Sequence, residues 1–207
     1  MTTLILDHIA VSCDALGSAT PELEAQLGAP LPVAGQHPDM GTHNRLTGMG
    51  PDFYFELIAI NPDAPAPGRP RWFNIDNFSG RARLTNWIVR CDDIDATLAA
   101  LPVGFGRPIS LTRGDLRWKM AVPDDGVLPW DGWAPAIIEW QGAAHPTQTL
   151  PDSGLRLLRL TLHHPDAAEM AELLGPMMPR DSVQFMPAEV PKLVAIFDGP
   201  DGEVRLE

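Results

Sequence analysis

Short apolar runs alternate with clusters of glycine, proline and aspartate along the whole chain. In the first third, residues 4–12, 31–33, 42–46 and 53–60 have the length and the β-branched or aromatic content of strands. Residues 14–28 are typical of a helix that opens at an aspartate and ends at a glycine. The expected order is therefore one strand, one helix and then three strands.

The same order returns after residues 61–80, a proline-rich stretch that is the best linker candidate, although its Trp72 and Phe73 predict contact with the body of the protein. A strand, a helix and three strands are then expected at residues 84–90, 92–101, 106–111, 117–122 and 136–140. A third, partial unit has expected strands at residues 155–162, 193–197 and 204–206 and a helix at residues 165–174.

The first strand of each half carries a matching segment, which indicates a duplication. Three apolar or cysteine positions recur at one constant spacing: Leu6 with Leu84, Val11 with Val89, and Cys13 with Cys91. At the same spacing, His8 of the first copy corresponds to Asn86 of the second. Repetition of this kind is typical of one supersecondary unit that is used twice.

These elements predict an α+β fold. Two βαβββ modules would form a curved, mostly antiparallel half-barrel, with a third, partial module appended. We expect one domain over residues 1–207, made of modules at residues 1–62, 81–142 and 155–207. The pocket should lie on the concave face of the sheet, where the two halves meet.

Composition narrows the classes of partner. The formal net charge of −12 argues against nucleic acids and anionic membranes, which are bound by clustered lysine and arginine. No apolar run approaches the length of a membrane-spanning helix, and the N-terminus lacks the basic start of a secretory signal. The sequence therefore predicts a cytoplasmic protein that acts on a small molecule, and it leaves a homodimer open.

Three polar residues interrupt otherwise apolar strands. His8, Glu56 and Glu139 each lie within a strand, and a buried carboxylate is costly unless it is paired, hydrogen-bonded or bound to metal. If a pseudo-two-fold axis relates the two halves, these residues and Asn86 converge near that axis. One imidazole and two carboxylates would form a divalent-metal site with open positions for water and substrate. The alternatives are a hydrogen-bonded core histidine and buried carboxylates that accept backbone or arginine hydrogen bonds.

With these features the sequence resembles a known family. Its βαβββ repeat, its Asp7-His8-Ile9 opening and its two glutamate-bearing strands are similar to those of the vicinal-oxygen-chelate superfamily, which includes glyoxalase I, extradiol dioxygenases and fosfomycin-resistance proteins. More narrowly, several segments resemble the glyoxalase-like domain subfamily of bacterial proteins. They are residues 35–44 (GQHPDMGTHN), 55–59 (FELIA), 138–140 (IEW) and 145–146 (HP).

By position, the resemblance implies that His8 and Glu56 are metal ligands of the first module. It implies that Glu139 is the second-module glutamate, which in glyoxalase I both contacts the metal and moves the substrate proton. The metal would be Zn, Ni, Mn or Fe. Asn86 departs from the family pattern, because a second histidine, a glutamine or a glutamate is expected there.

Further polar and aromatic residues are candidates for contact with the substrate. His43 would orient the substrate beside the catalytic Glu139. His37, Asn44, Trp118 and Trp140 would line the pocket. The alternatives are local turn hydrogen bonds around residues 42–44 and burial of the tryptophans in the core.

Two functions of different classes follow. The first is a divalent-metal-dependent lyase or isomerase, in which the metal stabilises an enediolate and Glu139 is the general base. The second is a metal-free protein that binds and sequesters a small molecule, which Asn86 favours. An extradiol-type dioxygenase is a weaker third hypothesis, since Asn86 stands where its second histidine ligand is expected. His43 could supply that ligand only if it lay within bonding distance of the metal held by His8.

Overall fold

The structure is a computed structural model that describes residues 3–207. The first module has the expected order: β1 (Ile5–Ser12), α1 (Leu16–Leu27), β2 (Val33–His37), β3 (Thr42–Gly48) and β4 (Tyr54–Ile60). Helix α1 ends where Gly28 adopts a left-handed backbone with a φ of 64°, which glycine tolerates best.

The second module repeats this order: β5 (Arg83–Arg90), α2 (Ile94–Ala100), β6 (Arg107–Arg113), β7 (Leu116–Val122) and β8 (Ala136–Trp140). Helix α2 begins at Asp93, whose carboxylate accepts a 2.9 Å hydrogen bond from the backbone N–H of Ala96.

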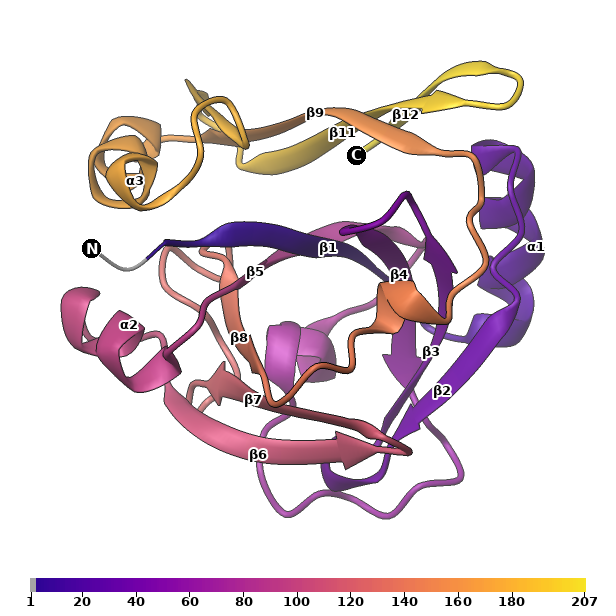
Figure 1. Ribbon diagram of the computed structural model, residues 1–207, viewed down its shortest axis with the longest axis horizontal. Coiled ribbons are helices and arrows are strands. Elements are labelled where there is room, and N and C mark those ends of the chain that lie inside the picture. The colour runs from indigo at the N-terminus through magenta and orange to yellow at the C-terminus, as the bar shows by residue number, and fades with distance from the viewer. Residues whose placement is uncertain (1–2) are drawn as a thin grey trace.

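The two modules share one eight-stranded sheet with the order β2-β3-β4-β1-β5-β8-β7-β6. Each half has the same internal order, and the halves meet where β1 pairs antiparallel with β5. Within each half the first and last strands are parallel, and the other neighbours are antiparallel. Figure 1 shows that the sheet curls strongly, so that its two ends approach each other. The predicted α+β fold with a curved sheet of paired modules is confirmed.

A second sheet covers the junction of the two modules. The third unit contains β9 (Arg156–His164), α3 (Ala167–Leu174), β10 (Gln184–Pro187), β11 (Lys192–Gly199) and β12 (Gly202–Leu206). Its strand order is β10-β9-β11-β12, so its pairing differs from that of the two modules. The sheet lies over the outer face of β1 and β5 (Figure 1), where Trp87 packs edge-on against Phe185 with ring centroids 6.2 Å apart.

Both central strands contain a β-bulge at the corresponding position. In β1 the register shifts at Asp7, and in β5 it shifts at Thr85. The two positions have the same spacing as His8 and Asn86. The duplication therefore extends to the irregular parts of the backbone, and a bulge re-aims the side chains beside it.

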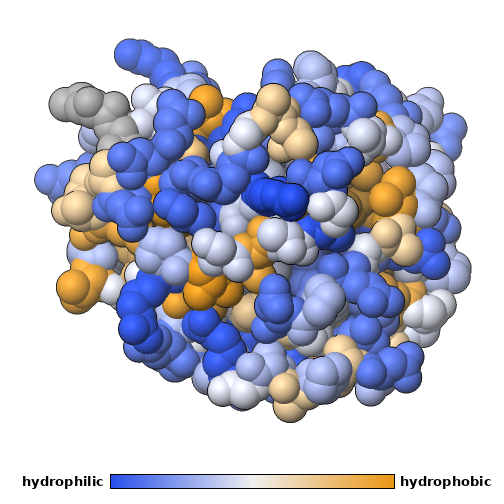
Figure 2. Space-filling view, turned by 60° about the horizontal axis from the view of Figure 1, so that its bottom comes forward, coloured by the Kyte–Doolittle hydropathy of each residue, from blue (hydrophilic) through white to orange (hydrophobic). Residues whose placement is uncertain are grey.

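Most of the face in Figure 2 is hydrophilic, and its hydrophobic side chains form separate patches. Across the whole described chain, five large hydrophobic residues are exposed: Ile5, Val103, Leu158, Met186 and Val190. Within residues 3–207, no helix has both the length and the apolar character needed to cross a membrane.

Candidate functional site

The concave face of the eight-stranded sheet encloses a void of about 30 Å³. His8, His37, Asn44 and Glu56 form a polar cluster around it. Strand alternation turns these side chains inward. Six of the residues proposed from the sequence line this void: His8, His37, Asn44, Glu56, Trp118 and Trp140. Glu139 and His43 do not line it.

The bulge in β1 places Asp7 beside His8. Leu6 pairs with Val89, and His8 pairs with Ile88, so Asp7 is the extra residue on β1. The extra residue breaks the strict alternation of side chains. Asp7 Oδ1 consequently lies 2.6 Å from His8 Nδ1, and both side chains are buried.

The Asp7 carboxylate accepts hydrogen bonds from several side chains at once. Its Oδ2 lies 3.0 Å from His145 Nε2, 3.0 Å from Trp140 Nε1 and 3.5 Å from Arg90 Nη1. Burial alone would raise the pKa of Asp7, but the hydrogen bonds and charges of His145 and His8 outweigh it and hold this pKa far below its usual range. Asp7 is therefore ionised at neutral pH and holds the His8 proton on Nδ1.

His8 presents its other ring nitrogen to the interior. Because Nδ1 carries a proton, Nε2 is free to accept one when the ring is neutral. His8 Nε2 lies 3.7 Å from Glu56 Oε2, and Tyr54 stacks on the ring with centroids 4.2 Å apart. Glu56 Oε1 accepts a 2.6 Å hydrogen bond from Asn44 Nδ2. An imidazole of fixed tautomer beside a carboxylate can transfer protons.

Asn86 lies on the same face of the sheet in the second module, although it does not line the void itself. Ala10, which points inward two residues after His8, pairs with Glu56 on β4 and with Asn86 on β5. Within residues 3–207, no group hydrogen-bonds the buried Asn86 Oδ1. This oxygen is therefore a hydrogen-bond acceptor left for a ligand or a water.

His37 lies at the rim of the cluster as a neutral ring. Its Nδ1 lies 2.9 Å from Thr42 Oγ1, and its Nε2 lies 3.4 Å from Asn44 Nδ2. Burial, and then the charge of Arg113, lower the pKa of His37 to about 3. His37 therefore supports Asn44 as an uncharged hydrogen-bond acceptor and remains so at neutral pH.

The stretch between the modules fills the interior. Trp72 and Phe73, at the start of the short helical segment η2 (Trp72–Asn77), are buried against the cluster. Phe73 and Asn74 have φ values of 63° and 53°, and a left-handed backbone costs about 1–2 kcal/mol for residues other than glycine. The backbone N–H of Asn74 donates to the carbonyl of Gly126 at 2.9 Å, which holds the segment in place.

The remaining void has room for a water but not for an organic molecule. Any larger ligand therefore reaches His8 only when a neighbouring side chain moves.

Replacing Gly126 should loosen the segment η2 (Trp72–Asn77), which packs in the interior of the sheet. Gly126 has a φ of 77°, and a Cβ there would lie 2.1 Å from the Arg71 carbonyl oxygen. We expect Gly126→Ala to lower the free energy of unfolding by more than about 2 kcal/mol, because a backbone clash adds to the left-handed cost. Gly132→Ala is the matched control in the same loop, with a φ of 96° and nothing within 4 Å of its Cβ. Urea unfolding compares them, and equal losses would contradict a close contact at Gly126.

The position of Glu139 corrects the expectation that it meets Glu56. Cys13 N donates to the Ile58 carbonyl at 3.0 Å, and Cys91 N donates to the Ile138 carbonyl at 2.9 Å. Ile138 is therefore the counterpart of Ile58. Ile58 and Ile138 are two residues further apart in the sequence than Cys13 and Cys91, which follow the first strands of the two modules. The counterpart of Glu56 is consequently Ala136, and Glu139 follows Ile138 on the opposite face of the sheet.

Glu139 has a structural contact on that outer face. Its Oε2 accepts a 2.8 Å hydrogen bond from the backbone N–H of Ile94, at the start of α2, and lies 3.8 Å from Lys119 Nζ. Glu139 therefore holds the beginning of a helix and does not face His8. The roles of metal ligand and general base expected for it do not fit this position.

The inward-facing positions do not fit the divalent-metal site that the resemblance implies. His8 and Glu56 are in place, but the second module contributes the neutral amide of Asn86 and the methyl group of Ala136. Zn, Ni, Mn and Fe sites are normally completed by further imidazole, thiolate or carboxylate ligands. Over residues 3–207, no three His, Cys, Asp or Glu side chains are grouped so that they could hold a metal ion.

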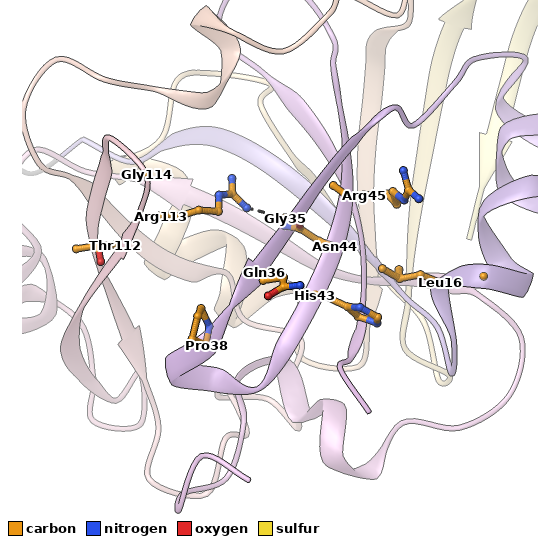
Figure 3. Close-up of a pocket in the computed structure, with 12 residues that line it drawn as sticks. Leu16, Gly35, Gln36, Pro38, His43, Asn44, Arg45, Thr112, Arg113 and Gly114 are labelled. Carbon is orange, nitrogen blue, oxygen red and sulfur yellow. Dashed lines mark hydrogen bonds between the residues drawn. The ribbon is translucent and has the colours of Figure 1, made fainter. Parts of the chain in front are cut away.

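His43 lies outside the interior. Alternation along β3 turns Asn44 inward and His43 outward. His43 lines a separate pocket of about 680 Å³ around the edge strand β2 (Figure 3). Burial is the main cause that lowers its pKa below the usual value. The expected role of His43 beside Glu139 is therefore corrected as well, since neither side chain reaches His8.

The chain belongs to the glyoxalase-like domain family, because the model of that family matches residues 6–178. This span contains both halves of the large sheet and every residue of the polar cluster. The resemblance drawn from the sequence motifs is therefore confirmed. No curated protein matches the chain.

Several solved structures match the chain at low sequence identity. A hypothetical protein from Staphylococcus aureus has a TM-score of 0.61 and 16% identity, covering 98% of this chain and 84% of its own. Methylmalonyl-CoA epimerase from Streptomyces coelicolor has a TM-score of 0.44 and 18% identity, covering 69% and 100%. The epimerase from Mycobacterium tuberculosis has a TM-score of 0.43 and 20% identity, covering 67% and 88%. The likeness to the Staphylococcus aureus protein shows a shared fold and nothing more.

Proposed function

We propose that this protein binds a small oxygen-bearing molecule and transfers a proton on it, as an isomerase or a lyase that needs no metal. One observation carries the proposal. The buried Asp7 carboxylate fixes the proton of His8 on Nδ1, which leaves Nε2 free 3.7 Å from Glu56. A histidine held in one tautomer by a buried carboxylate is suited to general acid–base catalysis.

The positions of the side chains support one sequence of proton transfers. His8 Nε2 takes a proton from a carbon next to a carbonyl group, and Asp7 stabilises the imidazolium that forms. Glu56 moves a second proton between the substrate oxygens, and Asn86 Oδ1 accepts a hydrogen bond from a substrate hydroxyl. Return of the first proton to the neighbouring carbon gives an isomer, and loss of a leaving group instead gives a lyase product.

Hydrogen exchange tests this function without knowledge of the product. The wild-type protein is incubated in D₂O with glyceraldehyde, dihydroxyacetone and other small hydroxycarbonyl compounds, and loss of carbon-bound hydrogen is followed by proton NMR. We expect exchange in at least one compound, at a rate that neither EDTA nor added Zn, Ni, Mn or Fe changes. Exchange that requires one of these metals would contradict the metal-free chemistry.

A metal-free binding protein is the second candidate. The void beside His8 is too small for an organic molecule, whereas the pocket around β2 measures about 680 Å³. That size suits a small ligand, and binding there requires no access to His8. A ligand that binds tightly, exchanges no hydrogen and is insensitive to His8 substitution would favour this candidate over the enzyme.

A further inference from the structure

Arg113 stands at the opening of the curved sheet. It is the last residue of β6, and β2 and β6 are the two ends of the eight-stranded order. Arg113 lines both the interior void and the pocket of about 680 Å³. Figure 3 shows its side chain reaching from the β6–β7 hairpin towards Gly35 and Asn44. Arg113 and Asn44 therefore form the boundary between the outer pocket and the cluster around His8.

The charge of Arg113 lacks a carboxylate partner within residues 3–207. Its Nη1 lies 3.5 Å from both His37 Nε2 and Asn44 Oδ1, which are neutral atoms at the outer limit of hydrogen bonding. No aspartate or glutamate is among the described residues that line the outer pocket. Glu56 lines the interior void with Arg113, but its carboxylate accepts a hydrogen bond from Asn44 and forms no ion pair with Arg113 among the described residues. A half-buried guanidinium without a counter-ion is poorly compensated, and an anionic ligand would compensate it.

Gly35 makes room for this guanidinium. A Cβ on Gly35 would lie 2.4 Å from Arg113 Nη1 and 2.4 Å from Asn44 Oδ1. A glycine inside a strand weakens the strand and commonly marks a close approach by another group. The edge strand β2 is therefore shaped to admit Arg113, which indicates a built site and not an arginine that happens to fold back.

We propose that Arg113 binds an oxyanion of the substrate, so that the substrate is a small organic anion with a carboxylate or a phosphate group. The guanidinium presents a planar fork of N–H donors that either group can accept in pairs. An anion at Arg113 lies at one end of a line of polar groups that continues through Asn44 and Glu56 to His8. The reacting end of the same molecule would then point towards His8. The link to His8 depends on the proposed function, but binding of the anion does not.

Simple anions test the binding step. The wild-type protein, labelled with ¹⁵N, is titrated in separate experiments with sodium acetate, inorganic phosphate and acetamide, which is the uncharged isostere of acetate. We expect saturable shifts of the backbone amides of Gly35 and Gly114 with acetate or phosphate and none with acetamide. The anion that binds more tightly distinguishes a carboxylate from a phosphate. Equal shifts with acetamide, or none with either anion, would overturn the proposal.

Matched substitutions assign the binding to one side chain. Arg113→Met removes the charge and should weaken binding of the preferred anion by at least about tenfold. Arg117→Met makes the same change in net charge on an exposed residue of the same hairpin and should leave affinity unchanged. If Arg113→Met does not fold, Arg113→Lys takes its place, because it keeps the charge and loses the fork. Unchanged affinity in the folded Arg113 variant would refute the site.

One further variant separates this proposal from the proposed function. His8→Gln should bind acetate or phosphate as the wild type does, because the anion contacts Arg113 and not His8. Intact anion binding without any hydrogen exchange in the wild type would refute proton transfer alone. The KM comparison uses a hydroxycarbonyl compound that carries a carboxylate or a phosphate group. Hydrogen exchange on that compound that survives in a folded Arg113→Met variant with unchanged KM would refute the anion site alone.

Discussion

Asp7→Asn is expected to lower the free energy of unfolding by about 3–5 kcal/mol, because hydrogen bonds to a charged group contribute about 1.5–3 kcal/mol each and several are weakened at once. The carboxylate of Asp7 is completely buried and accepts hydrogen bonds from His8, His145 and Trp140. An amide of the same shape places N–H groups against some of these N–H donors, and it removes the negative charge that strengthens the remaining hydrogen bonds. The loss should therefore be large although the side chain changes little in volume.

Urea unfolding at neutral pH measures this difference. Asp115→Asn is the matched control, because Asp115 is exposed in the turn between β6 and β7. A substitution at such a site usually changes stability by less than about 0.5 kcal/mol. If the two variants lose the same stability, the hydrogen bonds around Asp7 contribute nothing measurable to the fold.

The difference in unfolding free energy between wild type and Asp7→Asn should also depend on pH. The pKa of Asp7 is lower in the folded protein than its usual value of about 3.9 in an unfolded chain. Such a carboxyl group stabilises the fold above the unfolded pKa, and its contribution is lost as pH falls through the folded pKa. The difference between wild type and Asp7→Asn should thus be complete near neutral pH and shrink below about pH 4. A difference that stays constant down to about pH 3 would mean that the pKa of Asp7 is not lowered.

His8→Gln should reduce the rate of hydrogen exchange by a factor of about 10²–10⁴, the usual contribution of a general acid–base group. Glutamine can still donate a hydrogen bond to Asp7, but it cannot accept a proton from carbon at neutral pH. The loss should appear in kcat, while KM changes little, because His8 acts on the reacting proton and not on the rest of the ligand.

His163→Gln provides the control for this experiment. His163 lies on β9 in the second sheet, where it pairs with Lys192, far from the concave face in the topology. Its substitution should leave the exchange rate unchanged. If His8→Gln and His163→Gln exchange hydrogen at the same rate, His8 has no catalytic role. It would then be a hydrogen-bonded core histidine, the alternative that the sequence also allowed.

The fold was predictable because local patterns repeat. The matching segments at residues 6–13 and 84–91 begin corresponding strands, and each is followed by a helix and three strands in the structure. Apolar periodicity and turn residues act within a few positions of each other, so sequence alone carries them. The strand β10 (Gln184–Pro187) was not foreseen, since its Gln-Phe-Met-Pro sequence is short and partly exposed at a sheet edge.

Glu139 shows why the site was harder to predict than the fold. Two apolar strands with one glutamate each look alike, but the second half has two more residues between its first and last strands. The true counterpart of Glu56 is Ala136, and the difference of three positions turns Glu139 to the other face. Pairing register depends on loop length and tertiary contacts, and a similarity of composition does not reveal it.

Asp7 and Arg113 were missed for a related reason. Strict alternation places the neighbours Asp7 and His8 on opposite faces of a strand, and only the bulge brings them together. The adjacency of an aspartate and a histidine inside an apolar strand was the one available signal. In the sequence Arg113 was only one residue of an expected hairpin. Its contact with Asn44 joins the two ends of the eight-stranded sheet, and local patterns do not reveal a contact between residues so far apart in the chain.

Trp72 has a consequence for any measurement of affinity. Its indole is among the side chains that line the small void beside His8, so a larger ligand would compete with a group tethered to the protein's own backbone. The affinity observed for an external ligand is reduced by the fraction of molecules in which the tethered side chain is displaced. Weakening the contacts of Trp72 would therefore exchange stability of the fold for tighter binding. Selection for a tight binder would then be expected to favour less stable variants of this chain.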